Sequence, residues 1–288
     1  MTIDTAKIGR FDGKVILITG GSSGIGLAVA QQFTCKGATV VIGDLQAPIS
    51  SNERFEAQSH FVKTDVTSWD SQLSLYKKTL ELYGTIDIVV INAGISENEQ
   101  AFEDRTDSAS GDPIEPKWST LKVNLLGALI STKLSLHFLR KSFSGGAIVI
   151  VGSRACYDGF GMPVYTSTKH GVLGLVRSLK HFTPNWNIRL NVVAPGVTFT
   201  PLLPDITQKI YKERGYYMQT PDDAAKAVLF LAQEQSYNGK VISISGGKYR
   251  ELEGPLAEVK ESIYGADDFG LKDEDEGKAI LSACVTRF

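Results

Sequence analysis

Residues 14–26 read KVILITGGSSGIG, a short apolar run that ends in a glycine-rich loop. The run is rich in β-branched residues and is closed by glycines, which is typical of a strand buried on both faces. Beyond the loop, apolar residues follow helical spacing at Ile25, Val29 and Phe33, and Gly37 can end the helix. The segment therefore predicts a strand, a glycine loop and a helix in immediate succession.

The same alternation continues along the chain. Further strands are expected near residues 39–43, 60–62, 86–91, 147–151, 188–193 and 240–244, and helices near 71–83, 117–140, 164–179 and after Pro221. Strict alternation requires right-handed crossovers, and hence a parallel sheet with helices on both faces. We find no internal repeat and no Pro-, Gly- or Ser-rich linker. The sequence predicts an α/β fold: one doubly wound domain with a seven-stranded parallel sheet over residues 1–254. Residues 255–288 are expected to form a C-terminal extension that caps the domain or is partly disordered.

Bulk properties limit the classes of function. A net charge of −2, with 22% charged residues, gives no electrostatic basis for binding nucleic acid or an anionic membrane surface. Cys35, Cys156 and Cys284 are widely spaced, odd in number and not flanked by histidines, which argues against disulfides and against a metal site. Apolar runs resembling a signal peptide or a membrane-spanning helix are absent from the sequence. We expect a soluble, cytoplasmic protein with no metal, no nucleic-acid partner and no membrane partner.

The glycine loop has a chemical use beyond the turn itself. Glycines let the backbone turn sharply and let a pyrophosphate approach the helix N-terminus, where free N–H groups and the helix dipole favour anions. The residues of this predicted phosphate site are Gly20, Ser22, Ser23, Gly24, Ile25 and Gly26. An ordinary turn between strand and helix is the alternative, and the position after the first strand favours nucleotide binding.

Asp44 follows the second predicted strand, 24 residues after Gly20. An acidic residue there can accept hydrogen bonds from the adenosine ribose, and its charge repels a 2′-phosphate. Its neighbour is Leu45 rather than a basic residue. A turn residue with no role in binding is the alternative. We predict that the cofactor is NAD(H), in preference to NADP(H).

Tyr165 and Lys169 are four residues apart on a predicted helix, so their side chains share one face and can flank one cofactor ribose. A free tyrosine has a pKa of about 10, and a nearby ammonium group lowers that value by favouring the phenolate. The pattern is common by chance, and a pair on a surface helix is the alternative. Its place after the fifth strand, downstream of the glycine loop, favours a catalytic acid/base.

The spacing T-G-x-x-x-G-x-G at residues 19–26 resembles that of the short-chain dehydrogenase/reductase family, and further motifs follow in order from about Asp12 to Gly247. The resemblance implies a Rossmann-type fold. It also implies an adenine contact at Asp65 and Val66, a turn at Asn92, Ala93 and Gly94, a proton-relay asparagine at Asn124, a serine that orients the substrate oxygen at Ser153, and nicotinamide contacts at Pro195, Gly196, Thr198 and Thr200.

Two positions depart from the family pattern. Ile91 stands where a second asparagine is usual, and the separation of Ser153 from Tyr165 is 12 residues, one fewer than expected. The shorter spacing fits within the loop at residues 158–163. In detail, the residues Thr168-Lys169-His170-Gly171 after the tyrosine, and the acidic insertion after Gly94, resemble those of NAD-linked hydroxyl dehydrogenases of prostaglandin type and their fungal natural-product relatives.

A segment at residues 198–219 is rich in apolar and aromatic side chains, and the resemblance implies that it forms a lid over the substrate. Such a lid indicates a bulky, hydrophobic secondary alcohol or ketone. A helix that packs on the core or on another subunit is the alternative. The predicted function is hydride transfer between NAD(H) and this small molecule, in a homodimer or homotetramer. A recruited non-redox step, such as cyclisation or isomerisation, and a nucleotide-binding regulatory protein are the competing interpretations.

Overall fold

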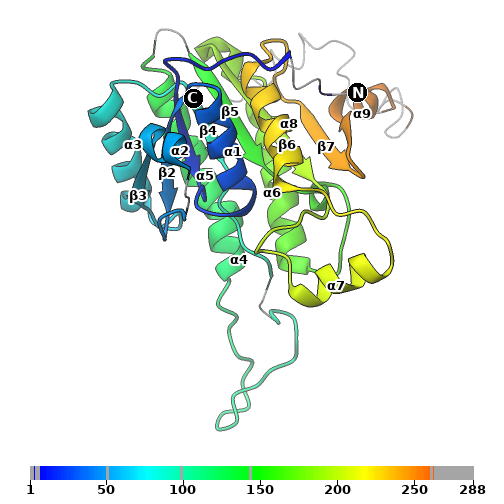
Figure 1. The fold of residues 1–288 in the computed structure, drawn as a ribbon. Helices are drawn as coiled ribbons and strands as arrows, with labels where there is room; N and C mark the ends of the chain where they lie inside the picture. The colour runs from blue at the N-terminus through cyan, green and yellow to red at the C-terminus, as the bar shows by residue number, and fades with distance from the viewer. Residues whose placement is uncertain are drawn as a thin grey trace.

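The computed structural model of the protein describes residues 3, 7–49, 52–97, 100–142, 145–259 and 262. One eight-stranded sheet runs through the centre of the molecule in the order β3-β2-β1-β4-β5-β6-β7-β8, and helices cover both of its faces (Figure 1). The order reverses between β1 and β4, as in a doubly wound sheet. The α/β fold predicted from the sequence is confirmed.

The seven predicted strands are all present and parallel. They are β1 (Val15–Thr19), β2 (Thr39–Asp44), β3 (Ser59–Lys63), β4 (Ile88–Ile91), β5 (Gly146–Val151), β6 (Ile188–Pro195) and β7 (Val241–Ser245). The sequence analysis missed β8 (Lys248–Glu251), which pairs antiparallel with β7. Gly246 and Gly247 join the two strands with φ of 58° and 69°, the two positive values that a two-residue hairpin of type I′ requires.

The predicted helices are present, and the structure contains further helices that the sequence analysis did not predict. They are α1 (Gly24–Cys35), α2 (Glu53–Gln58), α3 (Trp69–Tyr83), α4 (Ser119–Leu121), α5 (Gly127–Leu139), α6 (Pro163–Leu179), α7 (Asp205–Glu213), α8 (Pro221–Gln233) and α9 (Glu253–Glu258). The predicted helix at 117–140 is interrupted by a π-helical turn, η2 (Lys122–Leu126), between α4 and α5. Short 3₁₀ turns, η3 (Arg154–Cys156) and η4 (Thr183–Trp186), follow β5 and α6. Of the helices that the structure describes, none has the length and apolar character needed to cross a bilayer.

The core consists of two apolar layers, one on each face of the sheet. Side chains alternate along each strand, so Ile16 and Ile18 pack into the layer with α1 and α8, whereas Leu17 faces the layer with α3, α5 and α6. The central strands are almost completely inaccessible to solvent, which explains their continuous apolar sequence. This rigid base holds the loops at the C-terminal ends of the parallel strands.

Residues 102–115, between β4 and α4, extend away from the body of the molecule below α4 (Figure 1). Within this segment, Thr106 and Pro113 form an isolated antiparallel bridge, and all of its residues are exposed. At the other end of the chain, most of the predicted extension at 255–288 lies outside the described residues. The domain boundary at residue 254 therefore stays a prediction.

Candidate active site

The glycine loop lies at the C-terminal end of β1 and is packed too closely for a side chain at Gly20 or Gly26. Gly20 has a φ of 69° and donates its N–H to the Gly43 carbonyl oxygen at 2.8 Å. A Cβ atom on Gly20 would lie 2.7 Å from the Cα of Ala93, and one on Gly26 would collide with the Gly20 carbonyl oxygen. Glycine at both positions therefore lets the loop close onto β4 and α1.

The N-terminus of α1 is suited to an anion. Within the described chain, its N-cap Ser23 makes no side-chain capping bond, and the first turn carries no acidic residue. The first-turn N–H groups of a helix have no intrahelical acceptor, and the helix dipole adds partial positive charge there. The loop predicted to hold the pyrophosphate therefore has the geometry and the polarity for it.

Asn92 supports this loop from β4. Its Nδ2 donates to the Gly20 carbonyl oxygen at 2.7 Å and to the Thr19 carbonyl oxygen at 3.2 Å, and its backbone N–H donates to Thr19 Oγ1 at 3.2 Å. The neighbouring Ile91, at the position where a second asparagine was expected, is buried at the end of β4. The structure thus gives Asn92 a role in fixing the glycine loop.

Asp44 lies at the end of β2 and faces the glycine loop. Its Oδ2 accepts the Ser22 N–H at 3.1 Å, and its Oδ1 accepts the Leu45 N–H at 2.7 Å. An open pocket of about 520 Å³ lies between residues 22–24 and 44–47. None of the described residues that line this pocket is basic. The pocket has room for a ribose beside a carboxylate and offers no cation for a 2′-phosphate.

One carboxylate oxygen of Asp65 accepts hydrogen bonds within a local turn. Its Oδ1 accepts the Thr67 N–H at 2.9 Å and the Thr67 hydroxyl at 2.8 Å, directly before α3. The Val66 carbonyl oxygen accepts a hydrogen bond from Gln72 Nε2 at 2.5 Å. These bonds shape the entry to α3, and an adenine contact of Asp65 and Val66 stays a prediction.

Tyr165, Lys169 and Ser153 are gathered around the end of β5. Lys169 is 6% exposed, its Nζ donates to the Val151 carbonyl oxygen at 3.1 Å, and the same atom lies 5.6 Å from the centre of the Tyr165 ring. Ser153 is the N-cap residue of η3, which packs against α6, and its Oγ accepts the Ala155 N–H at 3.1 Å. The ammonium group and the phenol therefore share one face of α6, as the spacing predicted.

Asn124 lies in η2 and is 2% exposed. Its Oδ1 accepts the Ile95 N–H at 2.8 Å and its Nδ2 donates to the Ile95 carbonyl oxygen at 2.9 Å. A Cβ atom on Gly94 would lie 3.3 Å from Asn124 Oδ1 and 3.8 Å from Lys169 Nζ. The asparagine thus joins the interrupted helix to the loop after β4. Asn124 and Lys169 both lie beside Gly94.

The loop after β6 is held by hydrogen bonds to β7 and to Gln219. Gly196, which follows Pro195, donates its N–H to the Ile244 carbonyl oxygen at 2.8 Å, and the Thr198 hydroxyl donates to the Gly196 carbonyl oxygen at 3.0 Å. Gln219 Nε2 donates to Thr198 Oγ1 at 2.9 Å from a side chain that is 1% exposed. The sequence analysis missed Gln219, because a glutamine before a helix carries no signal of this contact.

The predicted lid begins against the glycine loop and then leaves the core. The Thr200 side chain lies 3.3 Å from where a Cβ on Gly24 would be. Every residue of α7 is at least partly exposed, and Ile206 and Tyr216 are 64% and 55% exposed. Apolar side chains therefore line this segment as expected. Closure of residues 198–219 over a substrate stays a prediction.

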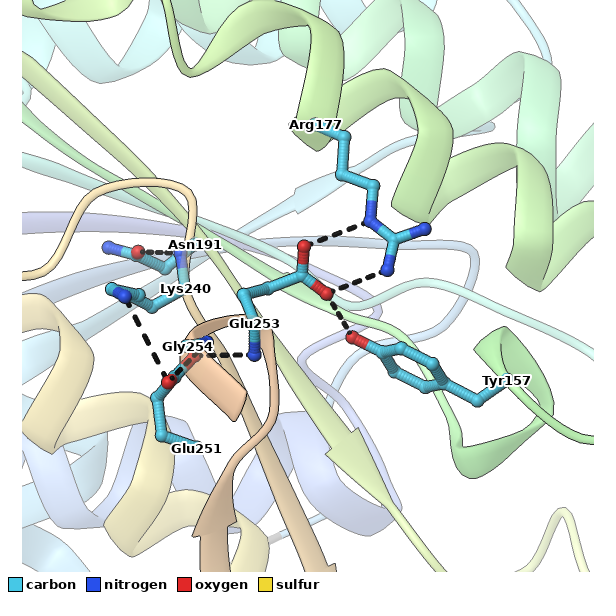
Figure 2. Close-up of polar contacts among 7 residues, drawn as sticks. All are labelled: Tyr157, Arg177, Asn191, Lys240, Glu251, Glu253 and Gly254. Carbon is cyan, nitrogen blue, oxygen red and sulfur yellow. Dashed lines mark hydrogen bonds and ion pairs between the residues drawn. The ribbon is translucent and has the colours of Figure 1, made fainter. Parts of the chain in front are cut away.

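Glu253 joins the C-terminal region to the loop that carries Ser153 (Figure 2). It accepts hydrogen bonds from Arg177 Nε at 2.9 Å, from Arg177 Nη2 at 2.8 Å and from the Tyr157 hydroxyl at 2.6 Å. Burial and then the bond to Glu253 raise the pKa of Tyr157 well above its usual value. Burial also raises the pKa of the neighbouring Cys156 thiol, which fits a packing residue rather than a nucleophile.

Glu97 was also missed. It lies in the loop after β4, and its Oε2 accepts the backbone N–H of Tyr165 at 2.8 Å. The two residues are separated by 68 positions in the sequence. Only the fold brings the carboxylate to this helix, so no spacing pattern could have identified it.

The sequence profile of a family described as short chain dehydrogenase matches residues 14–210. The short-chain dehydrogenase/reductase prx4 of Penicillium rubens is 35% identical, over 97% of this chain and 88% of its own. The short-chain dehydrogenase/reductase ascJ of Acremonium egyptiacum is also 35% identical, over 97% of this chain and 94% of its own.

Solved structures show the same architecture. Levodione reductase superimposes with a TM-score of 0.69 at 26% identity, over 83% of this chain and 98% of its own. An ElxO variant with NADPH bound gives a TM-score of 0.66 at 28% identity, over 81% of this chain and 98% of its own.

Proposed function

The chain belongs to the short-chain dehydrogenase/reductase family, and from that premise we propose that it transfers a hydride between NAD(H) and a bulky secondary alcohol or ketone. The similarities to known proteins support an oxidoreductase of this family. One observation carries the proposal. Tyr165 and the buried ammonium group of Lys169 share one face of α6, next to the turn that Ser153 caps.

Each residue has a distinct task in the proposed reaction. Bound NAD(H) supplies or accepts the hydride. The Tyr165 hydroxyl exchanges a proton with the substrate oxygen, and the Lys169 ammonium group stabilises negative charge on the tyrosine oxygen. The Ser153 hydroxyl orients the substrate oxygen and stabilises the developing alkoxide. Asn124 lies beside Gly94 and Lys169, in a position to support a proton path away from the lysine.

The cofactor preference rests on Asp44. Asp44 lines a pocket whose described lining contains no basic residue, which supports NAD(H). A phosphate placed beside this carboxylate would meet charge repulsion without a compensating cation. The NADPH-bound neighbour shows that related chains of this fold bind the other cofactor, so the preference has to be measured.

The substrate class rests on the predicted lid. Leu202, Ile206, Ile210 and Tyr217 in this segment are exposed apolar side chains, which supports a hydrophobic, natural-product-like substrate. The cytoplasmic location and the homodimer or homotetramer expected from the sequence stay predictions.

The test measures binding of NAD(H) and NADP(H) separately, and then follows the absorbance of reduced nicotinamide with a panel of bulky secondary alcohols and ketones. We expect tighter NADH binding and turnover that Tyr165→Phe abolishes. Turnover that survives in Tyr165→Phe would contradict the role of the phenol. Conversion of substrate without any change in nicotinamide absorbance would indicate a non-redox reaction.

A further inference from the structure

The N-terminus of α6 depends on a carboxylate from another part of the chain. Pro163 is the first residue of the helix and has no N–H group, and the Thr166 N–H already bonds the Met162 carbonyl oxygen. The first turn therefore leaves the N–H groups of Val164 and Tyr165 without an intrahelical acceptor. In the described chain, the N-cap Met162 makes no side-chain capping bond. Glu97 supplies the acceptor for Tyr165 at 2.8 Å.

The loop after β4 that carries Glu97, residues 92–97, is fixed at three points. Asn92 bonds the carbonyl oxygens of the glycine loop, Ile95 is bonded through both its N–H and its carbonyl oxygen to Asn124, and Glu97 bonds the N–H of Tyr165. Six residues thus connect the predicted phosphate site, the interrupted helix and the start of α6. A carboxylate at a helix N-terminus is further favoured by the helix dipole.

We propose that Glu97 is a positioning residue for Tyr165: its carboxylate fixes the first turn of α6 and so places the tyrosine hydroxyl relative to Ser153 and the reacting carbon. This inference rests on the proposed function, because it assigns Glu97 a role in a reaction in which Tyr165 moves the proton. The bond is to the backbone N–H of the tyrosine itself, so a shift of this turn moves the phenol directly. Small displacements of a reacting group reduce rates strongly.

Two substitutions of Glu97 separate the effect of its hydrogen-bond acceptor from the effect of its negative charge. Glu97→Gln keeps an oxygen that can accept the Tyr165 N–H and removes the charge, whereas Glu97→Ala removes both. The matched control is Glu103→Ala, an exposed carboxylate of the same segment. We expect Glu97→Ala to lower kcat by roughly tenfold or more, with NADH affinity within about twofold of the wild-type value because Asp44 and the glycine loop are unchanged. Glu97→Gln and the control should retain most of kcat.

Amide hydrogen exchange of the first turn of α6 provides a readout that does not need activity. The Tyr165 amide should be protected in the wild-type protein and in Glu97→Gln, and it should exchange faster in Glu97→Ala. Full protection in a folded Glu97→Ala would overturn the proposal, and so would faster exchange at an unchanged kcat. Equal loss of kcat in the Gln and Ala variants would also overturn it. No turnover of wild-type protein with the whole panel would contradict the proposed function instead, while exchange still shows whether Glu97 holds this amide.

Discussion

The Tyr157 hydroxyl donates a 2.6 Å hydrogen bond to Oε1 of Glu253, which lies 96 residues later in the chain. Arg177 completes the group with two bonds to the same carboxylate, and the Glu253 side chain is 10% exposed (Figure 2). Tyr157 directly follows η3, the turn that Ser153 caps. The C-terminal region is therefore attached to the loop that carries the predicted substrate-binding serine.

Glu253→Ala should reduce the free energy of unfolding by about 1–3 kcal/mol, because it leaves a half-buried phenol and a guanidinium group without their acceptor. Chemical denaturation followed by circular dichroism measures this loss. Glu258→Ala is the control on the same helix, since its side chain is exposed and its removal should change the free energy by less than about 0.5 kcal/mol. Equal effects of the two substitutions would show that the network adds nothing to stability.

The same network predicts how stability depends on pH. Burial raises the pKa of Glu253, but the hydrogen bonds from Arg177 and Tyr157 outweigh it and hold the pKa below its usual value. A lowered carboxyl pKa gives stability that is present above about pH 4.3 and is lost as pH falls through the folded pKa. The raised pKa of Tyr157 gives stability that is present below about pH 10 and is lost above it.

The difference in unfolding free energy between wild type and Tyr157→Phe should therefore be largest between about pH 5 and 9 and shrink on both sides. Denaturation curves of both proteins across this range provide the measurement. A difference that stays constant below pH 4 would show that Glu253 and Tyr157 are not energetically coupled.

Gly26→Ala should weaken NADH binding by at least about tenfold, since the added methyl group collides with the Gly20 carbonyl oxygen and deforms the predicted phosphate site. A fluorescence titration with NADH measures the effect. Gly174→Ala is the matched control, because a Cβ atom at this exposed position of α6 meets nothing within 4 Å. The control should bind NADH normally and gain about 0.5–1 kcal/mol of stability from better helix propensity.

Asp44→Ala should lower the affinity for NADH by about tenfold, because one or two hydrogen bonds to the ribose are lost. The ratio of NADH affinity to NADPH affinity should also become smaller. Parallel titrations with both reduced cofactors provide the ratio. Wild-type protein that binds NADPH more tightly than NADH would show that the carboxylate does not select the cofactor.

The sequence was most informative for features that a local pattern of residues determines. Buried parallel strands require apolar runs, and the glycine loop requires residues without Cβ, so both were visible in residues 14–26. The helix at 117–140 was predicted as continuous because a π-helical turn keeps apolar spacing on both sides. β8 was missed because a four-residue segment with three charged residues resembles a solvated tail, although Gly246 and Gly247 were the available signal.

Contacts between distant parts of the chain were not predictable in the same way. Glu97 and Glu253 each lie in segments without regular apolar spacing, and their partners are more than 60 residues away. Family resemblance assigned Asp65 an adenine contact, which stays a prediction, and the hydrogen bonds of its Oδ1 to Thr67 carried no signal in the sequence. A single sequence shows which residue types are present, but only the tertiary structure decides which of them meet.

The short strand β8 has a consequence for how copies of the chain can meet. The last strand of a sheet exposes unpaired N–H and carbonyl groups that can recruit a strand from another molecule. Here β8 already pairs with the outer edge of β7. The charged residues Lys248 and Arg250 of β8 are exposed to solvent, whereas Tyr249 is buried. The Tyr249 hydroxyl donates to the Asp223 carbonyl oxygen at 3.0 Å. A continuous sheet across two subunits through β7 would first have to displace this strand.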